Sequence, residues 1–413
     1  MPTSIMTSRE RVVAALNHRE PDQVPVDFGS MRSSGIVAAA YNRLKEHLAR
    51  TEAPHFAAGH VDVFDVRQQL AIVEPAIVDR FGGDVLPLDP DQLGEWQPYT
   101  LANGLQARTP ARYKFQAGDD GSLYWMEGAK RVAQRPSDGL YFDYIDFPLA
   151  HAKTVKDIEA YDFRGFSERE IGAMAAAGKK LFTETDKAIM GRFSGSVYER
   201  GQKLRGFEQF MIDLADGGPF LEALLSGIAD AHLETLKAYL AQVGDYIQLI
   251  QMSDDLGTQE ALQVSPAMYR RWIKPQHKRV YGYVREHYPH VQVFLHSCGA
   301  IRPLIPDLID AGVQVLNPVQ TSAKGMDPAA LKRDFGKDLT FWGGGAETQS
   351  TLIDGTLASI DAQVRERIAI FAPGGGYVFN PVHNIQADVE PENIVAVYDA
   401  AQRYIRDGWT RTQ

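Results

Sequence analysis

Residues 291–316 read VQVFLHSCGAIRPLIPDLIDAGVQVL, a stretch in which two strand-like runs flank a helix-like run. Val291–Leu295 and Val313–Leu316 are short, apolar and rich in β-branched residues, whereas Ile301–Ala311 carries apolar residues at helical spacing. A strand, a helix and a second strand in this order form a right-handed unit with parallel strands. The stretch therefore predicts a parallel α/β fold.

The same alternation continues on both sides of this stretch, at a spacing of roughly 30–40 residues per unit. We expect further strands at Val24–Phe28, Ala188–Gly191, Tyr246–Met252, Leu339–Trp342 and Tyr377–Phe379, and helices at Ile36–Leu48, from Arg192 through Leu240, from Ser265 onward and at Pro391–Tyr404. The count approaches eight strands, which predicts a (β/α)8 TIM-type barrel. No G-x-G-x-x-G element follows an early strand, and this disfavours a dinucleotide-binding fold.

Two segments stand outside the alternation. Thr7 precedes Glu10 by three residues, a capping-box pattern that predicts an N-terminal helical segment. Residues 88–149 carry short β-favouring pieces separated by turn signals such as Asn103-Gly104, which predicts an inserted β-rich excursion. We expect one barrel domain over residues 1–413, with the excursion lying on it.

The composition indicates which kinds of partner and which cellular compartment to expect. The 413 residues carry a net charge of −10 without a Lys/Arg run, which argues against nucleic acid as a partner. No apolar stretch approaches the ~20 residues of a membrane-spanning helix, and Arg9, Glu10 and Arg11 stand where a secretory leader would become apolar. Cys298 is the only cysteine, so no disulfide forms within the chain. We expect a cytoplasmic protein.

Polar residues follow the predicted strands, and in a parallel barrel reactive groups gather at the carboxyl ends of strands. We expect Asp254, Asp255 and Glu347 to be catalytic and Arg192, Tyr198, Gln259, Asn317, Gln320 and Asn380 to bind substrate. Asp254 and Asp255 are neighbours in an extended segment, so at most one of them faces the site. The other caps a helix or pairs with an arginine.

His296-Ser297-Cys298 is the sharpest chemical signal in the chain. Alternate residues of an extended segment point to the same side, so the imidazole and the thiol project together. Zn²⁺ favours nitrogen and sulfur ligands, and His383, just past the last predicted strand, supplies a third. Three protein ligands with an open fourth position are typical of a catalytic zinc. Taken alone, the pair also fits a packed cysteine beside a hydrogen-bonded histidine.

Several stretches in order resemble the uroporphyrinogen decarboxylase superfamily, and together they span nearly the whole chain. They are RERVVAALNHREPD at 9–22, HSCG at 296–299, NPVHNIQ at 380–386 and PENI at 391–394. The superfamily has two well-known branches. One is the decarboxylase, a barrel that works without a cofactor. The other contains zinc-dependent methyltransferases that pass a methyl group to or from a corrinoid protein.

The residues of this chain favour the methyltransferase branch. In the decarboxylase, an Arg-Gln-Ala-Gly-Arg-Tyr segment near the start of the barrel helps to hold the substrate carboxylates, whereas residues 27–35 here read DFGSMRSSG with the single arginine Arg32. The methyltransferases typically bind zinc through His-x-Cys and a later cysteine. His296 and Cys298 match the first two ligands, and His383 stands in place of the third. A histidine there leaves the site less negative and the metal a stronger Lewis acid.

The resemblance thus implies a methyltransferase that holds Zn²⁺ and moves a methyl group between a small substrate, such as a methoxy compound, and a corrinoid (cobalamin) on a partner protein. A metal-free decarboxylase or lyase, with an aspartate such as Asp254 stabilising a cationic intermediate, is the alternative. A corrinoid- or tetrapyrrole-binding module without catalysis is a third interpretation. The methyl donor, the acceptor and the direction of transfer stay open, and so does the oligomeric state, since relatives include monomers and homodimers.

Overall fold

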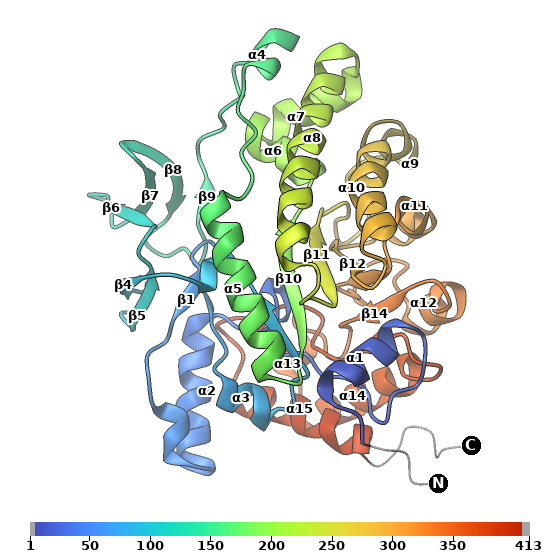
Figure 1. The fold of residues 1–413 in the computed structure, drawn as a ribbon. Helices are drawn as coiled ribbons and strands as arrows, with labels where there is room; N and C mark the ends of the chain where they lie inside the picture. The colour runs from blue at the N-terminus through green and yellow to red at the C-terminus, as the bar shows by residue number, and fades with distance from the viewer. Residues whose placement is uncertain (1–4, 407–413) are drawn as a thin grey trace. The chain divides into compact units, whose positions relative to one another are not determined.

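The computed structural model describes residues 5–406 and divides into two compact units. Unit 1 comprises Met1–Asp146 and Trp342–Gln413, and unit 2 comprises Phe147–Phe341. Most elements of the two units are labelled in Figure 1.

A seven-stranded sheet forms the framework, in the order β15-β14-β13-β12-β11-β10-β3. The four strand pairs from β10 to β14 are all parallel. From β10 to β15, neighbouring strands of the sheet also follow one another in the chain, and at least one helix lies between each pair in the sequence. The predicted TIM-type barrel is confirmed.

The predicted strand at Val24–Phe28 is reduced to a single bridging residue. Val26 pairs in parallel with Phe379 beyond β15 and with Gly83 before β3. This residue therefore occupies the eighth strand position between the two ends of the sheet. Pro25 has no N–H to donate to a ladder, which explains why no longer strand forms here.

Unit 2 contains the βα units β10 to β13. Its strands are mostly buried, and α5 and α10 pack against β10 and β12 (Figure 1). The unit comprises α4 (Val155–Glu159), α5 (Glu168–Glu184), β10 (Ala188–Ser194), α6 (Tyr198–Arg205), α7 (Phe207–Asp216), α8 (Pro219–Val243), β11 (Leu249–Ser253), α9 (Pro266–Met268), α10 (Lys274–His287), β12 (Gln292–His296), α11 (Ile305–Ala311), β13 (Val315–Asn317) and α12 (Pro328–Phe335).

The predicted long helical run up to Leu240 is three helices, α6, α7 and α8. Gly206 lies between the first two with φ +82°, and Gly217 and Gly218 precede α8 with φ +68° and +89°. These backbone angles are open to glycine and strained for other residues. The breaks follow from the three glycines.

Unit 1 contains both ends of the chain that the structure describes. Thr7 and Glu10 form the predicted capping box at α1. The unit comprises α1 (Ser8–Leu16), α2 (Ala38–Thr51), β1 (Val63–Asp65), β2 (Leu70–Ala71), α3 (Pro75–Arg80), β3 (Val85–Leu88), β4 (Trp96–Thr100), β5 (Gln106–Pro110), β6 (Lys114–Ala117), β7 (Leu123–Glu127), β8 (Lys130–Arg135), β9 (Asp143–Tyr144), α13 (Thr351–Asp354), α14 (Leu357–Phe371), β15 (Tyr377–Val378) and α15 (Pro391–Arg406); β14 (Thr340–Trp342) crosses the boundary between the units.

The predicted β-rich excursion is present as two small antiparallel sheets, β4-β5 and β6-β7-β8-β9. Its inner side packs on the rest of unit 1 through Val66, Ala133 and Phe142, with Trp125 against them.

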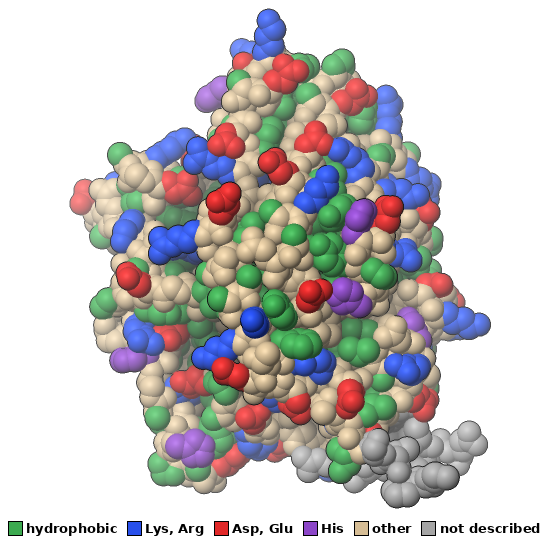
Figure 2. All heavy atoms as spheres, in the orientation of Figure 1, with side chains coloured by type: hydrophobic (Ala, Val, Ile, Leu, Met, Phe, Trp, Pro, Cys, Tyr) green, Lys and Arg blue, Asp and Glu red, His purple; other side chains and the backbone are tan. Residues whose placement is uncertain are grey.

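Acidic and basic side chains are interspersed on the face of the molecule drawn in Figure 2. Within residues 5–406, no helix is long and apolar enough to cross a membrane.

Candidate metal centre

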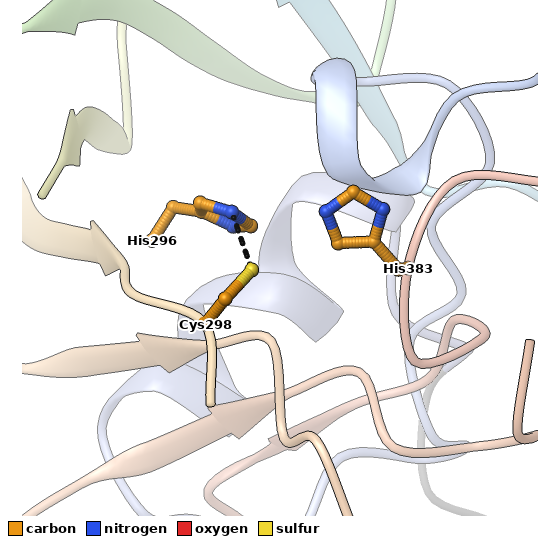
Figure 3. A group of neighbouring side chains, drawn as sticks. All are labelled: His296, Cys298 and His383. Atoms are coloured by element: carbon orange, nitrogen blue, oxygen red, sulfur yellow. Dashed lines mark hydrogen bonds between the residues drawn. The ribbon is translucent and has the colours of Figure 1, made fainter. Parts of the chain in front are cut away.

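His296 and Cys298 stand at the carboxyl end of β12, in unit 2. Val293, Phe294 and Leu295 are fully buried between β11 and β13, and this fixes the strand up to His296. The chain then turns so that Cys298 Sγ lies 3.3 Å from His296 Nε2 (Figure 3). The imidazole and the thiol therefore converge, as their spacing in the sequence predicts.

Asn317, at the end of β13, orients the imidazole. Its Oδ1 lies 2.7 Å from Nδ1 of His296 and accepts the Nδ1–H. In the neutral imidazole this leaves the lone pair on Nε2, the nitrogen that faces Cys298. Metal-binding histidines are commonly held by such a bond to the other ring nitrogen. The predicted substrate-binding residue Asn317 is thus placed as a positioning residue for His296.

The thiol of Cys298 is partly buried and lies next to a carboxylate. Burial and the neighbouring Asp255 raise the pKa of the thiol well above its usual value. The Cys298 backbone N–H donates to Asp255 Oδ1 at 2.8 Å, and the same oxygen lies 3.7 Å from His296 Nε2. Without a metal this environment holds a thiol, and a bound cation would favour the thiolate.

His383 lies in unit 1, on the loop that follows β15. Its Nδ1 lies 2.9 Å from Oδ1 of Asn384, whose side-chain amide donates to Gln68 at 3.0 Å. His296, Cys298 and His383 each offer one ligand atom that could bind a metal ion. A tetrahedral zinc with bonds of about 2.0–2.3 Å separates its ligand atoms by roughly 3.3–3.8 Å. The nitrogen and sulfur donors of this group fit that ion.

Asp254 has a structural environment. It is fully buried, and its carboxylate accepts the backbone N–H groups of Val197, Tyr198 and Glu199 at 2.7–2.9 Å. His277 Nε2 lies 2.8 Å from the same carboxylate. Of the two neighbouring aspartates, Asp254 is therefore the helix cap, at α6. Because these four partners occupy its oxygens, it is not placed as a catalytic group.

Asp255 and Glu199 form an acidic pair beside the His-x-Cys loop. Glu199, in the first turn of α6, accepts from the Ser253 hydroxyl at 3.0 Å. Burial raises the pKa of Glu199, and Asp255 raises it further. The sequence prediction missed Glu199, since an acidic residue in a first helical turn has an ordinary explanation in the helix dipole.

Gln259 and Gln320 support the loop that follows Cys298. Gln320 Oε1 accepts the backbone N–H of Gly299 at 2.8 Å, and its amide donates to Gln259 Oε1 at 2.5 Å. Gly299 has φ +90°, a conformation suited to glycine. The two glutamines fix the turn directly after Cys298.

The remaining predicted site residues are distributed over both units. Tyr198 is fully buried and its hydroxyl lies 3.2 Å from Met211 Sδ and from Gln263 Oε1, so it packs in the core of unit 2. Arg192 lies on β10 and is partly buried. In unit 1, Glu347 is 6% exposed, and Asn380 is fully buried with an Oδ1 that has no hydrogen-bond partner.

Arg32, the single arginine of the 27–35 segment, is held by three carboxylates. It donates to Asp65, and its two terminal nitrogens lie 2.5 Å from Asp89 and 2.6 Å from Asp91. Arginine binds carboxylates through these same N–H groups. Because all three of its nitrogens are occupied, Arg32 is not free for a substrate carboxylate.

The parallel sheet, its ring of helices and the polar residues at the strand ends define an α/β-barrel of the type that carries enzyme sites. The family model for uroporphyrinogen decarboxylase (URO-D) matches residues 150–404, well over half of the chain. The chain belongs to this enzyme family.

Individual relatives are distant. The chain is 27% identical over 278 residues to the uroporphyrinogen decarboxylase of Azotobacter vinelandii, which covers 63% of this chain and 72% of the relative. It is 26% identical over 274 residues to that of Pseudomonas fluorescens, with the same coverage. Among solved structures, a methyltransferase from Methanosarcina mazei superposes with a TM-score of 0.59 at 17% identity, over 96% of this chain and 99% of that one. This likeness supports the fold.

Proposed function

We propose that the chain is a zinc-dependent methyltransferase in which His296, Cys298 and His383 bind the metal. The proposal rests chiefly on the convergence of His296 Nε2 and Cys298 Sγ, 3.3 Å apart at the carboxyl end of the barrel strand β12. Bound there, Zn²⁺ supplies Lewis acidity to a heteroatom of the methyl donor or acceptor. The methyl group passes between a small substrate, such as a methoxy compound, and a corrinoid carried by a partner protein.

The residues around His296 and Cys298 orient these two ligands for the proposed chemistry. Asn317 presents Nε2 of His296, and Gln320 fixes the turn that carries Cys298. Asp255 lies next to both ligands and is 36% exposed at its side chain. A carboxylate in that position can take up the proton that leaves the thiol, or serve as a further ligand. Glu199, behind Asp255, extends the acidic surroundings.

Metal analysis tests the proposal directly. Wild-type protein purified with Zn²⁺ should hold about one ion per chain, and His296→Ala and Cys298→Ala should lose it. His287→Ala is the matched control, since His287 is an exposed histidine in α10 that contacts the carbonyl of Tyr283. Methyl transfer to cob(I)alamin should fall with the bound metal. Full methyl transfer by metal-free protein would refute the proposal.

A decarboxylase without a metal is the second candidate, because the curated relatives are uroporphyrinogen decarboxylases. The carboxylates around Arg32 count against it, since a porphyrinogen with many carboxylates needs free arginines. Release of carbon dioxide from a pyrrole acetate, unaffected by chelator, would favour this candidate.

A further inference from the structure

A small cavity in unit 1, of about 240 Å³, contains two arginines that have no acidic partner among the residues that the structure describes. It lies among α2, the turn after β4, the segment around β8 and the loop after His383. No aspartate or glutamate lines it. Its residues are Val37, Ala39, Arg43, Gln69, Leu101, Ala102, Asn103, Arg135, Gly139, Leu140 and Ala387.

Arg135 is the unusual member of this cavity. Three arginines of the described chain are more than nine-tenths buried, namely Arg11, Arg135 and Arg205, at 6%, 7% and 5% exposure. Arg11 pairs with Asp22 and Asp84, and Arg205 pairs with Asp213. Arg135 makes no ion pair with any of residues 5–406. It donates only to neutral groups, the Tyr99 hydroxyl at 2.9 Å and Gln69 Oε1 at 3.4 Å, and its Nε has no partner.

Arg43 adds a second uncompensated charge to the same cavity. Its Nη2 donates to the backbone carbonyls of Ala387 and Val389 at 2.5 and 3.0 Å, and its Nε has no partner. Within residues 5–406 no carboxylate pairs with it. Burying an arginine is costly unless an anion accompanies it. The buried Arg135 and the partly buried Arg43 on one cavity therefore call for an anion that residues 5–406 do not supply.

The backbone at Gln69 supports a binding role. Gln69 is 4% exposed and has φ +57°, a left-handed conformation that is uncommon for a residue other than glycine. Strained residues of this kind cluster where a ligand is held. Here the conformation sets the side chain of Gln69 against Arg135 and Tyr99.

The geometry points to a binding site in unit 1 for a small organic carboxylate, held by Arg135 and Arg43. The arginines bind the carboxylate, as guanidinium groups do elsewhere. Val37, Leu101, Leu140 and Ala387 surround an apolar body, which favours an organic anion over inorganic phosphate. The cavity is smaller than the roughly 300–1,000 Å³ of pockets for drug-sized ligands, so the ligand is compact. This site does not depend on a metal.

Titration calorimetry with benzoate, on protein treated with chelator, tests the site. Benzoate should bind to the wild-type chain, and benzamide, its neutral isostere, should bind at least tenfold more weakly, because the charge-assisted hydrogen bonds are lost. Arg135→Gln should weaken benzoate binding at least tenfold, and Arg43→Gln should weaken it by a smaller factor. Arg108→Gln is the control, since Arg108 belongs to the same unit but pairs with Asp62 outside the cavity.

Several results would overturn the inference: no benzoate binding, equal binding of benzamide, unchanged binding by Arg135→Gln, or phosphate competing as well as benzoate. Should Arg135→Gln fail to fold, Arg43→Gln decides, because its side chain is only half-buried. Benzoate binding that requires added Zn²⁺ would assign the ligand to the metal centre instead. A protein that never binds metal but binds benzoate would refute only the proposed function.

Discussion

The side chain of Asn317 determines which nitrogen of His296 is available to a metal, because its Oδ1 accepts a hydrogen bond from the other nitrogen. Asn317→Leu removes that acceptor and frees the imidazole to rotate or to change tautomer. We expect metal affinity to fall about 10–100-fold, the usual cost of losing such a partner. Competition with a chromophoric chelator measures it. Asn317→Asp keeps the acceptor and should retain the metal, and wild-type affinity in Asn317→Leu would contradict this role.

Glu199 gives a pH-dependent prediction, since burial raises its pKa in the folded state. Below the unfolded-state value of about 4.3 the carboxyl is protonated in both states and contributes no difference. As the pH rises above that value, the unfolded chain releases the proton more readily, so the folded state loses stability. Glu199→Gln should match wild-type stability near pH 4 and exceed it increasingly toward pH 8.

Urea unfolding midpoints across this pH range measure the effect on Glu199. Glu208→Gln, an exposed glutamate in the first turn of α7, should show no such divergence from wild type. A constant offset between Glu199→Gln and wild type at every pH would mean that the carboxyl ionises as easily in the folded chain as in the unfolded one.

At the scale of single elements, helix α6 is capped by Asp254, a residue that directly follows strand β11. Val197 provides no side-chain cap, and the three first N–H groups donate to Asp254 at the end of β11. Asp254→Asn replaces an acceptor with an amide donor against those groups. The free energy of unfolding should fall by about 1–3 kcal/mol.

Denaturant unfolding checks the Asp254 prediction. The control is Asp230→Asn, which removes an exposed partner of Arg279 and should change stability by about 0.5 kcal/mol or less. If Asp254→Asn lost activity with unchanged stability, the residue would act in catalysis after all, as its place at a strand end first indicated.

Strand positions could be predicted where the local pattern is strong. The runs at β10 to β15 are apolar and bounded by turns, and the sheet contains all of them. β3 was missed because Pro87 interrupts Val85–Leu88, and a proline argues against a central strand. In the candidate site, too, some features follow from the local sequence and others do not. The spacing of His296 and Cys298 predicts their convergence, whereas the roles of Asn317 and Asp254 depend on strands that meet only in the fold.

At the scale of the whole molecule, the proposed metal draws on residues 296, 298 and 383, which are far apart in the chain. A metal that binds only the folded chain stabilises it by about 2.7 kcal/mol at a free concentration of 100 times Kd. Adding a strong chelator to zinc-loaded protein should therefore lower the Tm by a few degrees in a scanning calorimeter. His296→Ala should show no chelator effect, and an equal drop in that variant would exclude this site as the cause.

Only Val26 bridges the two ends of the sheet, at Phe379 and Gly83, so few backbone hydrogen bonds close the barrel there. The Phe379 N–H donates to the Pro25 carbonyl, and the Asp84 N–H donates to the Val26 carbonyl. The Val26 N–H donates to the carboxylate of Asp84 instead of to a neighbouring strand. That carboxylate also forms an ion pair with Arg11 of α1, so the bonds at the closure depend in part on the first helix. The barrel should open here before it opens elsewhere, and the amides around Val26 should exchange with deuterated solvent sooner than those of β11 and β12.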